Sequence, residues 1–116
     1  MAQPVATMSV RKVNKAAIID IHGEVSGAAE STLMDAYTEV TSTGATAILL
    51  NFSGLDYMNS SGIGLLVTLL IRAQRQKQRL LAYGLSDHYR QIFEITRLNE
   101  AISIYPTEVE ALAAVA

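Results

Sequence analysis

Short apolar runs alternate with segments of helical periodicity along the 116-residue chain, and this alternation restricts the fold more than any other feature. Residues 45–52 and 80–85 are almost continuously apolar, as expected for strands that are covered on both faces. Each run is followed by a segment whose apolar residues recur at the period of an amphipathic helix. Because parallel strands need a crossover connection such as a helix, the alternation predicts an α/β fold.

The remaining segments extend this pattern to the order ββαβαβαβα. Two β-prone runs near the start have the spacing of an antiparallel hairpin, and a last short run completes the sheet. We expect strands at 5–12, 16–22, 45–52, 80–85 and 102–105, and helices at 27–41, 61–76, 86–97 and from 106 onward. The length suits one compact domain. Residues 1–116 are therefore predicted to form a single α/β domain with a mixed sheet of about five strands and four helices, its core spanning about 5–115.

Three of the predicted helices carry expectations about burial. The helix at 61–76 has apolar residues on nearly every side, Val67 and Ile71 among them, so most of its circumference is expected to be covered. In the helix at 86–97, Ser86 is the predicted cap, and the expected core residues are Tyr89, Ile92, Phe93 and Leu98. The last helix is expected to hold Pro106 in its first turn, with inward-facing residues Val109, Leu112 and Val115.

Composition argues against several classes of function. The chain has 9 Lys and Arg against 11 Asp and Glu, so no basic excess exists to neutralise a nucleic-acid backbone. There is no cysteine, and His22 and His88 are far apart in sequence, so no metal centre is predicted. The longest apolar stretch, residues 63–71, is shorter than the ~20 residues of a membrane helix, so no membrane insertion is expected. The N-terminus does not resemble a secretory signal, and we expect a cytoplasmic location.

The segment between the 45–52 strand and the next helix concentrates residues that could form a binding site. Residues 52–64 contain three glycines, three serines and one asparagine. In α/β sheets, ligands and partners meet the carboxyl ends of parallel strands, where the next helix presents unpaired N–H groups and the positive end of its dipole. Asn59 or Ser60 is suited to cap that helix.

A phosphoryl group on Ser60 would place up to two negative charges at this helix N-terminus, which the helix tolerates. A partner docked over the turn would have to desolvate that dianion, so the modification could switch binding. From the residues alone, an ordinary helix cap is the simpler interpretation, and the switch is the alternative. Neither Gly-x-Ser-x-Gly nor Gly-Lys-Ser/Thr occurs here, and no His lies near Ser60 in sequence. No catalytic residue and no cofactor are predicted.

Residues 55–66, Leu-Asp-Tyr-Met-Asn-Ser-Ser-Gly-Ile-Gly-Leu-Leu, resemble the signature of STAS domains, whose usual form is Met-Asp-Ser-Ser/Ala-Gly-Leu-Gly. Residues 19–25 and 48–55 are similar to two strands of that family, so the resemblance covers roughly residues 5–115. It implies a non-enzymatic anti-sigma factor antagonist, whose partner is an anti-sigma factor that is often an ATP-dependent serine kinase. That kinase would phosphorylate Ser60 and weaken the complex, and a metal-dependent serine phosphatase would restore it.

The predicted partner-binding face joins the end of the second strand to the turn before the helix. It consists of Glu24, Ser26, Met58, Asn59, Ser60, Ser61, Gly62 and Gly64. Asn59 and Ser26 stand where the family usually has Asp; if those carboxylates orient the kinase, Ser60 is expected to be a poor substrate while binding is kept. Two other functions stay open: a non-phosphorylated STAS subunit of a scaffold or lipid-transport ATPase complex, and a nucleotide-binding turn at Gly62–Gly64. The sequence leaves the oligomeric state and the identity of the sigma factor open.

Overall fold

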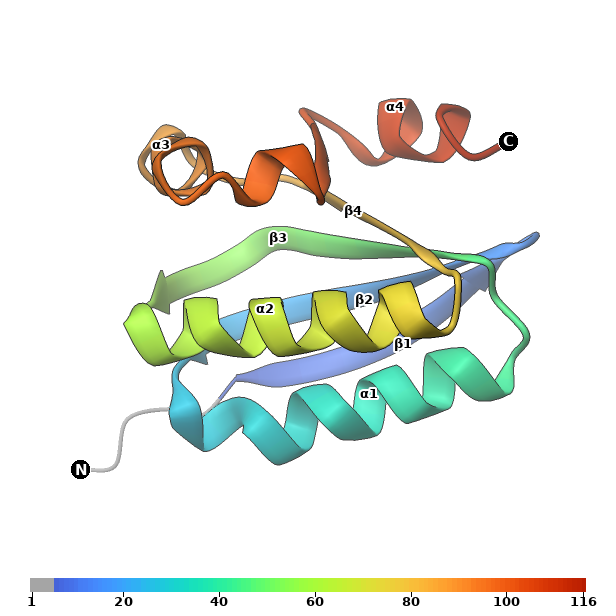
Figure 1. Ribbon diagram of the computed structural model, residues 1–116, viewed down its shortest axis with the longest axis horizontal. Helices are drawn as coiled ribbons and strands as arrows, with labels where there is room; N and C mark the ends of the chain where they lie inside the picture. Colours follow the sequence, from blue (N-terminus) through green and yellow to red (C-terminus); the bar gives the residue numbers. More distant parts are fainter. Residues whose placement is uncertain (1–5) are drawn as a thin grey trace.

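The computed structural model describes residues 6–116 and has the predicted α/β architecture (Figure 1). Its strands are β1 (Thr7–Val13), β2 (Ala16–Val25), β3 (Ala47–Met58), β4 (Arg79–Tyr83) and β5 (Ser103–Tyr105). Its α-helices are α1 (Glu30–Ser42), α2 (Ser60–Arg75), α3 (Asp87–Ile95) and α4 (Glu108–Ala113), with short 3-10 helices η1 (Gly27–Ala29) and η2 (Leu98–Glu100). The predicted order ββαβαβαβα is confirmed. The expected strand start at residue 5 lies outside the described residues.

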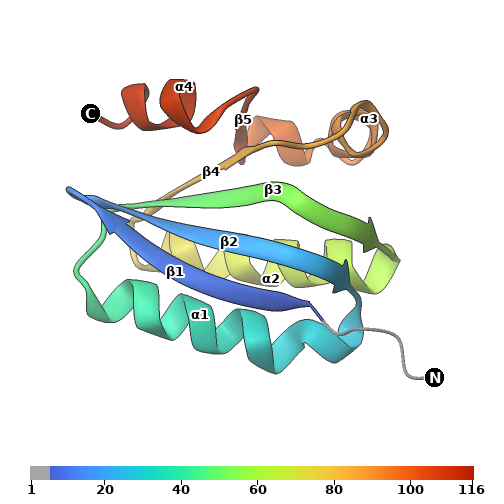
Figure 2. The same ribbon diagram turned by 180° about the vertical axis from the view of Figure 1, so that it is seen from behind.

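The five strands form one mixed sheet in the order β1-β2-β3-β4-β5. β1 pairs antiparallel with β2, and the other three pairings are parallel. Figures 1 and 2 show α1 and α2 side by side along the sheet, whereas α3 and α4 lie beyond β4, away from α1 and α2. Within residues 6–116, no helix is long and apolar enough to cross a membrane.

Two hydrophobic clusters follow from the two-residue period of the strands. In β3, Ile48 and Leu50 belong to the larger cluster, which includes residues of α1, α2 and α3. The alternate residue Leu49 belongs to a smaller cluster with Ala111 of α4. In the larger cluster, the rings of Phe52 of β3 and Phe93 of α3 meet edge to face, with 6.2 Å between their centroids. The central strands are thus covered on both faces, as their apolar runs predict.

The end predicted for the central strand is wrong, because β3 continues past residue 52 to Met58. Its added residues pair with the second half of β2, where the register shifts twice. A Cβ built on Gly54 would overlap the imidazole ring of the exposed residue His22, so a larger residue at this strand position would require that ring to move. Glycine and serine suggested a loop in this segment, but pairing with β2 keeps it extended and carries the chain directly to α2.

The expected coverage of α2 is also wrong. Its buried residues are Gly62, Leu65, Leu66, Leu69 and Ala73, on one side of the helix. Val67 and Ile71 are 39% and 45% exposed, because no described element packs over their side of α2. A sequence pattern shows which residues of a helix are apolar, but how many sides of that helix are covered by other elements depends on the rest of the fold.

The other helices correct smaller expectations. α4 begins at Glu108 with Thr107 as its cap, so Pro106 precedes the helix instead of lying in its first turn. Val109 is 77% exposed and does not face the core, whereas Leu112 and Val115 pack against the smaller cluster. Ser86 caps α3 as predicted. That helix ends at Ile95, and the core residue Leu98 belongs to η2.

Candidate functional site

The start of α2 is set by Asn59, which occupies the N-cap position with an extended backbone. Its side-chain oxygen accepts a hydrogen bond from the Gly62 N–H at 2.9 Å, and its carbonyl accepts from the Ile63 N–H at 3.0 Å. Of the two predicted candidates, Asn59 is therefore the cap. Ser60 becomes the first residue of α2, and its side chain is exposed.

The end of β2 is bound tightly to this turn. The Asn59 N–H donates to the Val25 carbonyl at 3.3 Å, immediately after the last pair of the β2–β3 ladder, Val25 with Met58. A Cβ on Gly62 would overlap that carbonyl oxygen and would lie 2.8 Å from the Met58 side chain. Gly62 is therefore required for α2 to start this close to β2. The two segments form one closely packed corner of the molecule.

Ser26 shapes the neighbouring turn. Its hydroxyl accepts a hydrogen bond from the Ala28 N–H at 3.3 Å and so caps η1, the short helix that leads into α1. Glu24 pairs with Tyr57 across the β2–β3 ladder and is half-buried. The structure thus places Glu24 near the end of β2 and Ser26 immediately after that strand, both next to the α2 turn, as the topology predicts.

The predicted face divides into two kinds of residue. Met58 and Gly62 are buried, and Met58 belongs to the larger core cluster. These two residues therefore support the turn from the side of the core. Ser60, Ser61 and Gly64 are exposed and form the accessible part of the turn. Asn59, like Glu24 and Ser26, is half-buried. That the residues of this face contact a partner stays a prediction.

Tyr89 is a residue of this site that sequence reasoning placed only in the core. It is buried as expected, but its hydroxyl also accepts a hydrogen bond from the Met58 N–H at 2.8 Å. This bond ties α3 to the last residue of β3, directly before the cap of α2. A tyrosine at a helical core position is the signal that could have found it, because a buried phenol usually has a hydrogen-bond partner.

The strongest electrostatic cluster lies elsewhere, on the face of the sheet that α4 covers. Arg11 donates to both carboxylate oxygens of Asp20, at 2.6 and 2.9 Å, and to Glu108 of α4 at 2.7 Å. These hydrogen bonds from Arg11 lower the pKa of Asp20 and the pKa of Glu108. The Tyr83 hydroxyl also donates to Glu108, at 2.6 Å. This cluster holds α4 on the sheet and does not reach the α2 turn.

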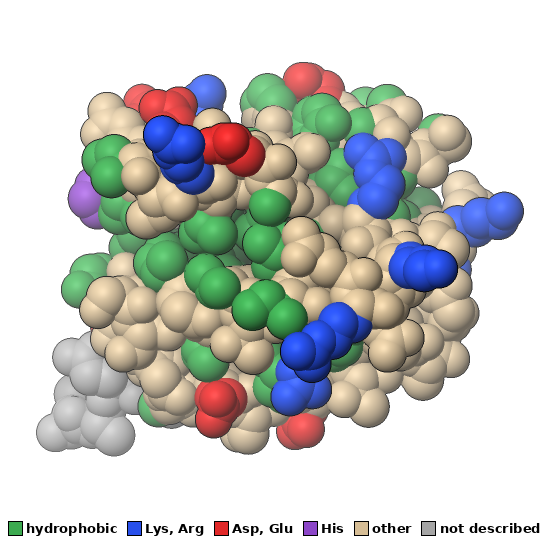
Figure 3. Space-filling model, in the orientation of Figure 1, with side chains coloured by type: hydrophobic (Ala, Val, Ile, Leu, Met, Phe, Trp, Pro, Cys, Tyr) green, Lys and Arg blue, Asp and Glu red, His purple; other side chains and the backbone are tan. Residues whose placement is uncertain are grey.

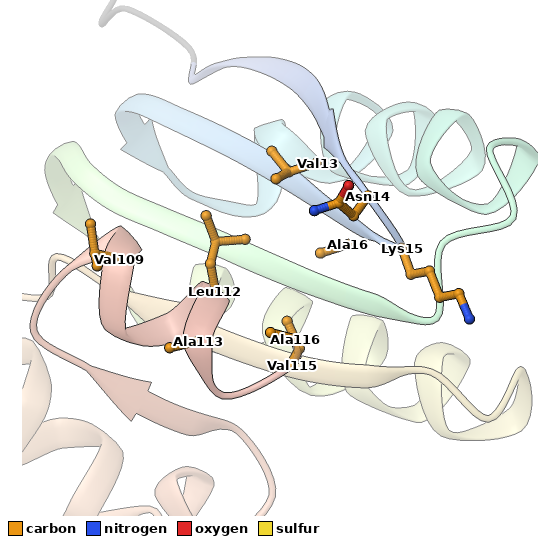
Figure 4. Close-up of a pocket in the computed structure, with 9 residues that line it drawn as sticks. All are labelled: Val13, Asn14, Lys15, Ala16, Val109, Leu112, Ala113, Val115 and Ala116. Carbon is orange, nitrogen blue, oxygen red and sulfur yellow. The ribbon is translucent and has the colours of Figure 1, made fainter.

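A hollow of about 290 Å³ lies at the opposite end of the sheet, between the β1–β2 hairpin and α4 (Figure 4). Its lining is mainly apolar, and Figure 4 shows the Lys15 side chain extending away from the other lining residues. Among the described residues, no group of three or more His, Cys, Asp or Glu side chains could hold a metal ion. Within the described residues, the predicted binding face therefore contains neither this hollow nor a group of side chains that could bind a metal ion.

Comparison with known proteins identifies the family. The STAS domain model matches residues 7–111. The anti-sigma-B factor antagonist of Staphylococcus aureus is 30% identical over 93 residues, which cover 79% of this chain and 86% of the relative. An anti-sigma factor antagonist from Mycobacterium paratuberculosis has a similar fold, with a TM-score of 0.81 at 20% identity over 95% of this chain and 93% of the other. The Bacillus cell fate determinant SpoIIAA in its phosphorylated form gives a TM-score of 0.73 at 25% identity, over 95% and 100% of the two chains. The chain belongs to the STAS domain family.

Proposed function

We propose that this chain is a single-domain anti-sigma factor antagonist, which binds an anti-sigma factor through the start of α2 and is regulated by phosphorylation of Ser60. The observation that carries the proposal is the position of Ser60. Asn59 supplies the cap, so within residues 6–116 the Ser60 hydroxyl has no hydrogen-bond partner and is exposed. The hydroxyl is therefore open to solvent in the folded domain, as a phosphorylation site requires. The relative from Staphylococcus aureus, an anti-sigma-B factor antagonist, supports the antagonist part of this proposal.

The helix N-terminus explains how a phosphate would act. The first N–H groups of α2 and the positive end of its dipole stabilise negative charge at Ser60, so the modified domain stays folded. An anti-sigma factor bound over the turn would have to remove water from a dianion, which is costly without a new positive charge. Phosphorylation is therefore expected to weaken the complex. A serine phosphatase would restore it.

The domain itself performs no chemistry in this proposal and needs no cofactor. Its function is to sequester the anti-sigma factor and thereby free a sigma factor, which places it in the cytoplasm with the transcription machinery. Asn59 is uncharged, and so is Ser26 on the neighbouring turn. If a carboxylate at these positions orients the kinase, Ser60 will be phosphorylated slowly while binding stays intact.

The test uses purified anti-sigma factors from the organism that makes this chain. Each is mixed with the wild-type protein and ATP, and intact mass spectrometry counts the phosphates added. We expect a single phosphate that Ser60→Ala abolishes and that Ser61→Ala, a matched change at the next exposed serine, retains. Ser60→Asp should weaken the complex in calorimetry while its circular dichroism spectrum stays native.

Two results would contradict the proposal. Phosphate that persists in Ser60→Ala would show that the site is wrong. Recovery of this protein in a transport ATPase or scaffold complex, with no binding to any anti-sigma factor, would favour the alternative of a non-phosphorylated subunit.

A further inference from the structure

No contact within the described structure explains why residue 64 is a glycine. It lies in the second turn of α2 and is exposed, and a Cβ built on it meets no heavy atom of another element within 4 Å. Gly62 differs, because its Cβ would overlap the backbone of β2. A glycine inside a helix destabilises it relative to alanine, since glycine loses more backbone freedom on folding. Something outside the described contacts would explain why this position lacks a side chain.

The residues around Gly64 form one exposed stripe along α2. Ser60, Gly64, Val67 and Ile71 are spaced four, three and four residues apart, which places them on the same side of the helix. Val67 and Ile71 are the exposed large hydrophobic residues of this helix, with 39% and 45% of their surface accessible. Figure 3 shows hydrophobic side chains gathered in a band over α2, running toward a group of Lys and Arg side chains. The stripe therefore joins the predicted phosphorylation site to an uncovered apolar surface.

The charge of α2 indicates what the stripe would accept. The helix has no acidic residue, and Arg72 and Arg75 lie in its last turn. In the part of the chain that the structure describes, neither arginine forms an ion pair. Both line a hollow of about 290 Å³ beside Tyr37 of α1. With the positive dipole end at Ser60 and two free guanidinium groups at the other end, the stripe complements a negatively charged partner.

We propose that an acidic α-helix of the anti-sigma factor packs along this stripe, with its backbone closest at Gly64, its apolar side chains on Val67 and Ile71, and its carboxylates at Arg72 and Arg75. A missing side chain allows two helices to approach closely, and an amphipathic helix uses anchors at this spacing. The proposal rests on the proposed function and adds the chemistry of the partner. It also explains the switch, because a phosphate on Ser60 would lie beside the acidic helix and repel it.

Gly64→Ala tests the proposal because it should move stability and binding in opposite directions. The added methyl group meets nothing in the free domain and removes the cost of glycine in a helix, so the melting temperature should rise by about 3 °C. In the complex the same methyl group occupies the space needed by the partner helix, so Kd should increase about tenfold. The control is Thr38→Ala, on the exposed side of α1, which should also raise the melting temperature and leave Kd unchanged.

Charge provides a second test with the same purified anti-sigma factor. Arg75→Glu is expected to slow association and to reduce the dependence of the association rate on salt, since it removes a steering charge. Arg97→Glu, an exposed change in the segment after α3, should alter neither value.

The outcomes separate this proposal from the one on which it rests. If wild-type protein binds the anti-sigma factor and Gly64→Ala binds equally well, the helix proposal is overturned while the proposed function stands. If wild-type protein binds no anti-sigma factor, both fail. If light scattering shows a wild-type dimer that Gly64→Ala dissociates, the stripe binds a second copy of this chain, and the partner-helix proposal is wrong.

Discussion

Asn59 should control both the stability of the domain and its quality as a kinase substrate. In Asn59→Ala, the Gly62 N–H loses the acceptor that it contacts at 2.9 Å, while the backbone bonds of residue 59 to Val25 and Ile63 remain. Loss of an N-cap side chain costs about 1 kcal/mol, which for a domain of this size lowers the melting temperature by roughly 5 °C. Asn59→Asp keeps the acceptor and adds a negative charge at the dipole, for a gain of about 0.5 kcal/mol.

Thermal and urea unfolding followed by circular dichroism measure the three proteins under the same conditions. The expected order of stability is Asp, then Asn, then Ala at position 59. Equal stability of Asn59→Ala and the wild type would refute the capping role. The same proteins then enter the kinase assay, where Asn59→Asp should be phosphorylated faster than wild type if a carboxylate orients the kinase. An unchanged rate would show that the missing charge at this position is irrelevant to phosphorylation.

Three further predictions follow from contacts in the described residues. Gly62→Ala should lower the free energy of unfolding by about 2 kcal/mol in urea, because its methyl group overlaps the end of β2. Tyr89→Phe removes the acceptor of the Met58 N–H, so hydrogen exchange of that amide should speed up and the free energy of unfolding should fall by about 1 kcal/mol. Unchanged exchange of this amide would argue against the hydrogen bond. Asp20 and Glu108 have lowered pKa values, so their ionised carboxylates stabilise the folded state at neutral pH, and this stabilisation is lost as the pH falls below about 4. Arg11→Met should make the free energy of unfolding in urea less dependent on pH in this acid range.

Much of the fold could be predicted from the sequence because its signals are local. The two-residue period of strands and the 3.6-residue period of helices depend on neighbours along the chain, so they predict the element order that the structure has. Ser86 was identified as a cap for the same reason, since a cap bonds only to the next turn of its own helix. The position of the α2 turn beside the end of β2 followed from the rule that parallel strands end at the same edge.

Other features required the tertiary structure, because they depend on segments that are remote in sequence. Pairing with β2 extends β3 to Met58, and the bond from Met58 to Tyr89 joins residues 31 positions apart. The sequence marks Val67 as apolar but cannot say whether another element covers it. Only the folded chain shows that no described element does, and that Gly64 on the same side has open space above it. The sequence alone thus determined the order of the elements and placed the candidate site at the start of α2, whereas the packing of distant segments decided which of the candidate residues are buried and which are exposed.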